Sequence, residues 1–371
     1  MEKTFWVCFF SFISVGRSWD LINFGINENY YISDIAIYRS KAFLTLPRSV
    51  CHNHIINPTV IEVPWSGGFM QSAATIVNTR TKILDHQKWE NCNDIQDAIS
   101  LVIEPTATWP KLWILDKGNE VCTPKIWSYN IIYNSLSDFG ELENIPGRDL
   151  NSIVIDPIQG EFGYRMYVGN AGENTLLIFT TKNLKWWKVT LQEPSNSVPF
   201  SINADFLTIS KTDSALYITG KNNLDLFSIN LDEIRNFEEP LPYEAQVCNN
   251  YFSMEVNATL LGQKLGISTG LEADLKSGLN YYMVRDYVVV RWLIGLPMDA
   301  EYHNVLAQSY ENMPYVVDLF TCPQYGLWAL VNPLSPEDCN EINNTIAENI
   351  PKLSTRVIKI LKYNKFLDNM Y

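Results

Sequence analysis

Short runs that are apolar on both faces of an extended strand recur along the chain, and residues 109–118 (WPKLWILDKG) are the clearest example. Leu112 and Ile114 point to one side of such a strand, and Trp113 and Leu115 point to the other. A strand with two apolar faces is typical of the inside of a stack of sheets. The polar residues 116–119 then predict a turn, and residues 125–131 predict the returning strand of a hairpin.

This hairpin pattern occurs six times, at irregular spacings, which indicates a repeated strand-rich unit. We expect strand pairs at residues 42–47 with 59–63, 112–115 with 125–131, 166–170 with 176–179, 216–220 with 224–227, 281–284 with 288–292, and 327–332 with 356–360. Six such units predict an all-β fold, a six-bladed β-propeller in which each small sheet packs on its neighbours. A pair of two-sheet sandwiches is the alternative, but it accounts less well for the repeat.

Two further elements are expected at the ends of the chain. A ring of sheets closes only if its termini meet, so residues 19–24 should complete the last blade. Helical periodicity is nearly absent. The one fair helix candidate covers residues 339–350, with its cap at residues 335–337 and its end before Pro351.

The N-terminus has the pattern of a secretory signal peptide. A short polar start precedes an apolar run at residues 5–15, and small residues follow at 16–18. The run is shorter than the roughly 20 apolar residues that span a bilayer, and no later segment has that length without charges. A buried N-terminal strand is the alternative. We therefore expect a secreted, extracellular protein with a signal peptide at 1–18 and one propeller domain at 19–371.

Charge and cysteine content narrow the function classes. The net charge of −13 argues against nucleic acid or an anionic membrane as a partner, because both bind basic patches. Outside the leader, an even number of cysteines in an exported chain favours disulfides: Cys51, Cys92, Cys122, Cys248, Cys322 and Cys339. No C-x-x-C spacing occurs, so no zinc site is expected. Asn257 and Asn343 begin glycosylation sequons.

Three motifs suggest chemistry, and each has a plainer interpretation. Residues 266–270 match G-x-S-x-G, but a nucleophile elbow needs a following helix, and another strand is expected here. His52 and His54 could form a metal pair, but they lie in a predicted loop without a third ligand nearby. Asp116 begins an oxygen-rich turn without EF-hand spacing, so it is expected to bind backbone amides. We expect neither a metal nor a cofactor.

Residues 112–118 resemble the "LWVLDSG" signature of the Yellow and major royal jelly protein family of insects. Similar matches follow in the family's order along nearly the whole mature chain: residues 46–48 with "VPR", 57–60 with "PATL", 92–103 with "C--I-SV", 262–292 with a late-blade pattern ending in tryptophan, 328–332 with "LWVLSNR", and 356–358 with "FRIL". Residues 85–87 depart from the family's "PYP", and Pro333 stands where it has arginine. The chain thus resembles a divergent member.

The resemblance implies a secreted six-bladed propeller with a central channel. Members act in cuticle and eggshell pigmentation and hardening, in larval nutrition and in capture of biogenic amines, and some are described as dopachrome-converting enzymes. Cys92 and Cys122 flank the Trp113 hairpin and fall within the matched segments, so we expect a disulfide between them. We nominate Asn332 as a ligand-binding residue because it ends a strand that resembles a ligand-bearing segment. The alternative is that Asn332 only makes a turn with Pro333.

Recurrent aromatic residues are expected to fill the core first: Trp113, Trp127, Tyr167, Tyr217, Tyr282, Trp292 and Trp328. A channel that is also acidic and lined by aromatics would favour a small aromatic amine or catechol, through cation–π and carboxylate contacts. Two functions remain: a non-catalytic extracellular binder in cuticle, eggshell or pigmentation biology, and a dopachrome-converting isomerase. Isomerisation needs an acid–base group that titrates near neutral pH, and the four histidines are poorly placed for it. The binder is therefore preferred, and whether the protein is an enzyme stays open.

Overall fold

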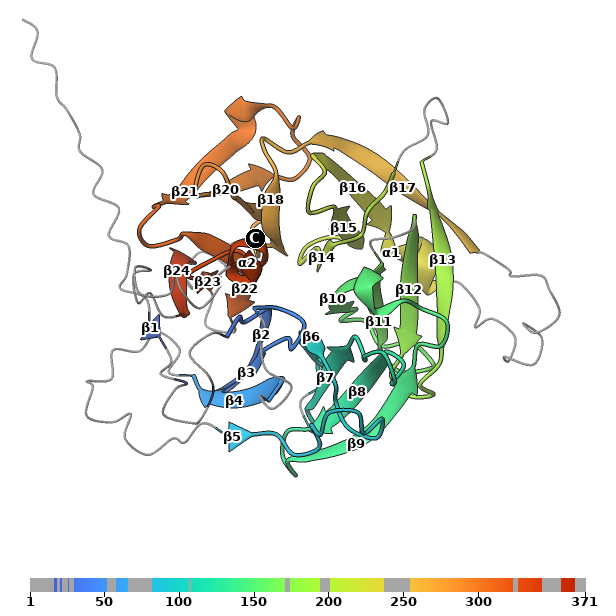
Figure 1. Ribbon diagram of the computed structural model, residues 1–371. Coiled ribbons are helices and arrows are strands. Elements are labelled where there is room, and N and C mark those ends of the chain that lie inside the picture. Colours follow the sequence, from blue (N-terminus) through green and yellow to red (C-terminus); the bar gives the residue numbers. More distant parts are fainter. Residues whose placement is uncertain are drawn as a thin grey trace, which may run out of the picture.

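A computed structural model gives the arrangement of the chain, with residues 17–18, 21, 26, 30–51, 58–65, 82–106, 108–170, 174–193, 201–236, 254–322, 326–341 and 355–363 described. The fold is all-β, and its sheets stand side by side around a central axis (Figure 1). Four of them have four strands each and one has eight. This arrangement is a β-propeller.

The strands follow one another in simple antiparallel order within the sheets. The first sheets contain β2 (Asp34–Tyr38), β3 (Lys41–Thr45), β4 (Val60–Pro64) and β5 (Lys82–Ile83), then β6 (Ala98–Ile103), β7 (Lys111–Asp116), β8 (Lys125–Asn130) and β9 (Ser135–Glu141). The last sheets contain β18 (Ser268–Ala273), β19 (Gly278–Met283), β20 (Val288–Leu293) and β21 (His303–Gln308), then β22 (Tyr315–Cys322), β23 (Gly326–Asn332), β24 (Arg356–Lys362) and β1 (Arg17–Ser18).

The eight-stranded sheet consists of two antiparallel halves joined at their outer edges. One half contains β10 (Leu150–Ile155), β11 (Arg165–Asn170), β12 (Thr175–Thr180) and β13 (Trp186–Gln192), and the other contains β14 (Phe206–Ile209), β15 (Ala215–Thr219), β16 (Asp225–Asn230) and β17 (Met254–Gln263). Strands β13 and β17 pair in parallel, from Val189 with Met254 to Gln192 with Asn257. A short helix, α1 (Leu231–Arg235), follows β16.

The predicted hairpins coincide with the second and third strands of the repeated units: β3–β4, β7–β8, β11–β12, β15–β16, β19–β20 and β23–β24. Their two apolar faces pack into different cores. Leu112 and Ile114 lie in the cluster shared with the β2–β5 sheet, whereas Trp113 and Leu115 lie in the cluster shared with β10–β12. All four side chains are fully buried, as a strand inside a stack of sheets requires.

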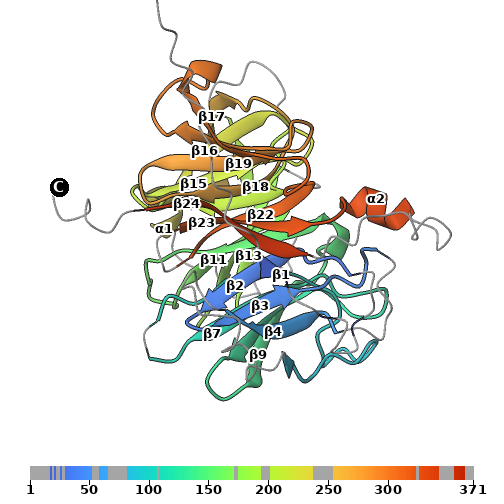
Figure 2. The ribbon, with the colours of Figure 1, turned by 90° about the vertical axis from the view of Figure 1, so that its left-hand side faces the viewer.

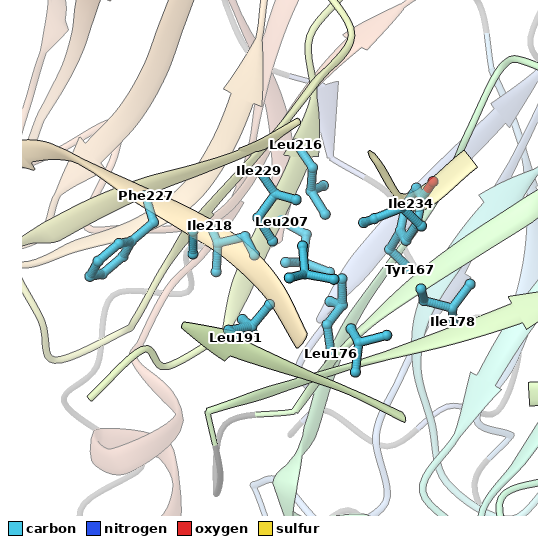
Figure 3. Close-up of a cluster of buried hydrophobic side chains, with 14 of the residues drawn as sticks. Tyr167, Leu176, Ile178, Leu191, Leu207, Leu216, Ile218, Phe227, Ile229 and Ile234 are labelled. Carbon is cyan, nitrogen blue, oxygen red and sulfur yellow. The ribbon is translucent and has the colours of Figure 1, made fainter. Parts of the chain in front are cut away.

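The largest of these clusters joins the two halves of the eight-stranded sheet. Figure 3 shows Tyr167 and Leu176 of one half facing Leu207 and Ile218 of the other. Side chains of this size are worth roughly 1.5 to 3 kcal/mol each when fully buried. Interdigitation between neighbouring sheets therefore stabilises the ring more than any single hydrogen bond does.

The N-terminal segment pairs with the last sheet through two residues that precede the expected segment 19–24. Strand β1 pairs with β24, with Arg17 opposite Val357 and Ser18 opposite Arg356. Of the expected segment 19–24 only Leu21 is described, and it is fully buried in the core between the first and last sheets. Residues 1–16 lie outside the described part. Cleavage of a leader after Ser18 would remove β1.

The second helix, α2 (Pro336–Glu341), begins three residues before the predicted one. The Ser335 hydroxyl accepts a hydrogen bond from the Asp338 backbone N–H at 3.0 Å, so it caps the first turn. Pro336 therefore takes the first helical position, where it has no amide to leave unsatisfied. Residues 342–350 of the predicted helix lie outside the described residues. Helix α2 projects from one face of the ring beside the channel (Figures 1 and 2).

Candidate functional site

A cavity of about 520 Å³ lies on the axis of the ring. Its walls are built by the first strand of each repeated unit, β2, β6, β10, β14, β18 and β22, together with loops at one end. Each of these strands contacts the next, and β22 contacts β2, so the wall is continuous. A concave site of this volume suits a small molecule.

Hydrogen bonds to the Asp34 carboxylate connect the first two strands of the wall, β2 and β6. Its carboxylate accepts hydrogen bonds from the Ser100 hydroxyl at 2.6 Å and from the Leu101 backbone N–H at 2.7 Å. The Ser100 hydroxyl oxygen in turn accepts a hydrogen bond from the Ile153 backbone N–H of β10 at 3.2 Å. Asp34 is therefore held in one orientation, with donors from a neighbouring sheet around it.

Glu272 of β18 is a second acidic residue on the cavity wall. Its carboxylate accepts hydrogen bonds from the Thr208 hydroxyl of β14 at 3.0 Å and from the Thr321 hydroxyl of β22 at 2.6 Å. The Lys211 ammonium lies 3.6 Å from the same carboxylate. Glu272 thus links three strands of the wall, and its charge is balanced within the protein.

Asp34 and Asp318 form a carboxyl pair on the cavity wall. Loss of solvent around Asp318 raises the pKa of its carboxyl well above the usual value, and the charges of Asp34 and Glu272 add to this effect. Burial also raises the pKa of Asp34 to about 6, although the donors from Ser100 and Leu101 oppose the rise. At neutral pH the pair therefore shares one proton, with Asp318 donating a hydrogen bond to the ionised Asp34.

Stability should depend on pH through this pair. The folded protein holds the Asp34 proton more tightly than the unfolded chain, whose pKa is 3.8. The resulting stabilisation is complete below that pH and is lost as the pH rises through about 6. Relative to Asp34→Asn, wild-type protein should therefore lose up to about 3 kcal/mol of unfolding free energy between pH 4 and pH 7. Urea denaturation at several pH values measures this difference, and a pH-independent difference would contradict the assignment.

One mouth of the cavity is formed by loops that join the second and third strands of the units. The Asp205 carboxylate accepts hydrogen bonds from the Asn151 side-chain amide at 2.8 Å and from the Lys221 backbone N–H at 2.7 Å. The Lys221 ammonium forms an ion pair with Glu337 of α2 at 2.5 Å. Lys117, from the β7–β8 loop, also lines the cavity. The mouth is therefore polar and carries charges of both signs.

A disulfide between Cys51 and Cys339 ties α2 to the loop between β3 and β4, with a Cα–Cα distance of 4.9 Å. Tyr31 and Tyr315 pack beside this bond in a small buried cluster, and Tyr31 also lines the cavity. The bond joins the first sheet to the connection between the last two strands. The expected Cys92–Cys122 disulfide is also present, with a Cα–Cα distance of 5.2 Å.

Asn332 lies behind the cavity wall. Its side chain is 1% exposed, and its amide donates to the Ile32 carbonyl at 2.8 Å while its oxygen accepts from the Ile32 N–H at 3.3 Å. The Thr355 hydroxyl donates to the same oxygen at 3.1 Å. These contacts fix the segment that carries Tyr31, and Asn332 is not among the residues lining the cavity. A direct ligand contact by Asn332 stays a prediction, and the structure gives it a supporting position.

The seven aromatic residues nominated from the sequence are all buried between sheets, and none lines the cavity. They therefore fill the core. The aromatic residues on the cavity wall are Tyr31, Phe206 and Phe320. These belong to, or directly precede, the first strands of their units.

The G-x-S-x-G segment leads into a strand, as expected, because β18 begins at Ser268. Ser268 is fully buried, and its hydroxyl accepts a hydrogen bond from the Lys264 ammonium at 2.7 Å. Burial lowers the pKa of Lys264 to about 7, opposed by the charges of Asp205 and Asp225. Since both side chains are shielded from solvent, they do not form an accessible nucleophile.

The histidines and sequons are only partly described. His52 and His54 lie outside the described residues, as does Asn343. His86 lies 3.4 Å from the Asp94 carboxylate, away from the cavity wall. Asn257 is exposed on β17. Within the described ranges no group of three or more His, Cys, Asp or Glu side chains could hold a metal ion, and no helix is long and apolar enough to cross a membrane.

The acidic residues of the cavity were missed at the sequence level. Asp34 and Asp318 each interrupt an apolar run that precedes a predicted hairpin, whereas Glu272 lies in a more polar segment between Leu271 and Ala273. A charged residue inside such a run was the available signal, because the first strand of each unit otherwise carries aliphatic side chains. Superposing the repeats would have placed all three residues on first strands.

Comparison with known proteins establishes the fold. No model of a known protein family matches the chain, and no curated protein matches it. Among solved structures, a regucalcin from Agrobacterium tumefaciens, described as a calcium-binding protein, is 12% identical, covers 91% of this chain and 94% of its own, and has a TM-score of 0.52. A virginiamycin B lyase from Staphylococcus aureus is 12% identical over 85% of this chain and 80% of its own, with a TM-score of 0.47.

The chain has a β-propeller fold. At 12% identity the likeness to regucalcin carries the fold alone, and it brings no activity or ligand with it. Neither structure is a Yellow protein, so the resemblance to that family stays a prediction. The two disulfides are compatible with an oxidising compartment.

Proposed function

We propose that this chain is a secreted propeller of six blades that binds a small aromatic amine or catechol in its central cavity, as an extracellular factor of the Yellow type. The blade count treats the eight-stranded sheet as two blades, because its halves each have four antiparallel strands and join only through β13 and β17. The resemblance of residues 112–118 and of the later segments supports the family and, with it, a role in cuticle, eggshell or pigmentation biology.

The observation that carries the proposal is the Asp34–Asp318 pair on the wall of the axial cavity. One shared negative charge, held by fixed donors and poorly solvated, complements an ammonium group. Tyr31, Phe206 and Phe320 also line the cavity and add aromatic surface that can contact a flat ligand. The aliphatic residues between them provide the apolar surface that excludes water.

We test this proposal with protein purified from culture medium. The affinity for an amine is compared with the affinity for its uncharged analogue. Tyramine and dopamine should bind at least about tenfold more tightly than 4-ethylphenol and 4-methylcatechol in isothermal titration calorimetry at pH 7.5, because only the amines can pair with Asp34. Equal affinity for the charged and uncharged compounds, or no binding of either, would overturn the proposal. Recovery from the medium reports on secretion in the same preparation.

A dopachrome-converting isomerase is the second candidate, and the pKa of Asp34 favours it. A carboxyl that titrates at about pH 6 beside a protonated partner can accept and return a proton near neutral pH. The two candidates differ in turnover. Loss of dopachrome absorbance that depends on the protein and disappears in Asp34→Asn would support the isomerase, whereas amine binding without turnover supports the binder.

A further inference from the structure

An ion pair crosses one mouth of the cavity. The Lys221 ammonium of the β15–β16 loop lies 2.5 Å from the Glu337 carboxylate of α2, which follows β23. The cavity wall runs from β14 to β18 and then to β22, so the β18–β21 sheet stands between the two sheets that carry these residues. Because Lys221 itself lines the cavity, a contact that bypasses this sheet passes over the mouth. We call this contact the Lys221–Glu337 bridge.

The bridged mouth lies at the end of the cavity where the first strands begin. The strand before the bridging lysine ends at Thr219, opposite Phe206, the first residue of β14. The strand before α2 ends at Asn332, opposite Tyr315, the first residue of β22. Asp34 is the first residue of β2 and therefore lies at the same end. The bridged mouth is thus the shorter path from solvent to Asp34.

The main chain is fixed on both sides of the bridge, so the bridge opens by rotation of its two side chains. The Lys221 N–H donates to Asp205 at 2.7 Å, and α2 is held by the Cys51–Cys339 disulfide. The Lys221 and Glu337 side chains are 36% and 62% exposed. Exposed side chains change rotamer within picoseconds to nanoseconds, which is fast compared with ligand exchange. The rate of passage therefore scales with the fraction of time for which the bridge is open.

We infer that the Lys221–Glu337 bridge controls access to the cavity: ligands pass through the mouth beside α2, and the bridge slows entry and exit alike. An ion pair between exposed groups shifts the balance between open and closed forms by up to about fivefold. Since the bridge acts equally on the free and the occupied cavity, it changes the rates of exchange and leaves the affinity unchanged. The inference rests on the proposed function for the identity of the ligand, whereas the control of passage belongs to the cavity itself.

Labelling of a thiol placed inside the cavity tests the inference without a ligand. Val154 of β10 lines the cavity and is partly exposed, so Val154→Cys supplies the thiol. N-Ethylmaleimide, an uncharged reagent of similar size to tyramine, should modify it about threefold faster once Glu337→Gln is added. Salt at about 0.5 M should accelerate labelling similarly with Glu337 present and have no effect in Glu337→Gln, because salt screens exposed ion pairs. Mass spectrometry of the peptide that contains position 154 measures these rates.

Two comparisons separate the bridge from other effects of the substitution. In a Lys221→Gln background, Glu337→Gln should leave the labelling rate unchanged, because its partner is already absent. Asp232→Asn removes a carboxylate that is 60% exposed and paired with Arg235, away from the cavity wall, and should also change nothing. Equal labelling with and without Glu337, or a response to Glu337→Gln that persists without Lys221, would overturn the inference.

Tyramine exchange relates the bridge to the proposed function. In stopped-flow measurements at pH 7.5, Glu337→Gln should raise the association and dissociation rates about threefold each and leave their ratio unchanged. Loss of a negative charge without an effect on passage would instead slow association of the cation. Faster labelling without any tyramine binding would overturn the proposed function and leave the bridge standing. Tyramine binding with unchanged labelling would do the reverse.

Discussion

Replacing Asp34 by Asn is expected to weaken binding of an aromatic amine about 100-fold at pH 7.5. The substitution removes the one net negative charge of the carboxyl pair while preserving the size of the side chain, so it removes a charge-assisted contact worth roughly 1.5 to 3 kcal/mol. Wild-type affinity should itself fall as the pH decreases below about 6, because Asp34 then becomes protonated. Calorimetric titrations at pH 7.5 and pH 5 measure both effects.

Two matched substitutions serve as controls for this result. Asp318→Asn replaces a carboxyl that is already protonated at neutral pH with a group that donates the same hydrogen bond, so affinity should change only a few-fold. Asp138→Asn alters an exposed residue of β9 and should change nothing. Undiminished amine binding by Asp34→Asn, or an equal loss in Asp138→Asn, would show that the acid pair is not the amine site.

Loss of the Cys51–Cys339 disulfide should destabilise the protein more than loss of the Cys92–Cys122 disulfide. The bond closes a loop of 288 residues, and the chain-entropy model assigns about 5.7 kcal/mol to a loop of this length. The Cys92–Cys122 bond closes a loop of 30 residues and should contribute about 3 to 4 kcal/mol. The first bond also holds α2 beside the cavity mouth, so its loss should weaken ligand binding as well.

Double serine variants test which disulfide contributes more to the free energy of unfolding. Guanidinium unfolding of Cys51→Ser/Cys339→Ser and of Cys92→Ser/Cys122→Ser, each compared with the parent protein under non-reducing conditions, gives the two free-energy differences. A smaller loss for the Cys51–Cys339 pair would show that the ring is held mainly by its packed cores. In that case residual structure would already restrain the 288-residue loop in the unfolded chain, so the disulfide would remove less entropy than the model assigns.

Most of the architecture was predictable because a strand that is apolar on both faces can be recognised from a few consecutive residues. Trp113 and its flanking residues identify a buried strand from the local sequence alone, and the recurrence of that pattern identified the repeat. The Cys92–Cys122 bond followed from the same hairpin and the family resemblance. Helix α2 was displaced because Ser335 caps a turn that begins at once with Pro336, whereas the prediction gave more weight to the later apolar residues.

The cavity was not predictable from local pattern, because its groups come from distant parts of the chain. Asp34 and Asp318 lie near opposite ends of the sequence, and they meet only when the first and last sheets become neighbours. Sequence reasoning nominated Asn332 from the end of a second strand, but the cavity wall consists of first strands. The pairing of β1 was not predicted, since its two residues carry too little pattern to identify a strand.

Because the first and last sheets are neighbours, the ring can close only after nearly the whole chain has been synthesised. Ribosomes deliver β2 and Cys51 early, whereas β22 and Cys339, which they must meet, emerge near the end of translation. Sheets whose strands are adjacent in sequence, such as β6–β9 with its Cys92–Cys122 bond, can assemble while the rest of the chain is still being made. The partners of the last sheet must wait until nearly the whole polypeptide is available, and contacts of such long range form slowly. We therefore expect the joining of the two ends to be the last and slowest step of maturation, with oxidation of Cys51 and Cys339 marking its completion.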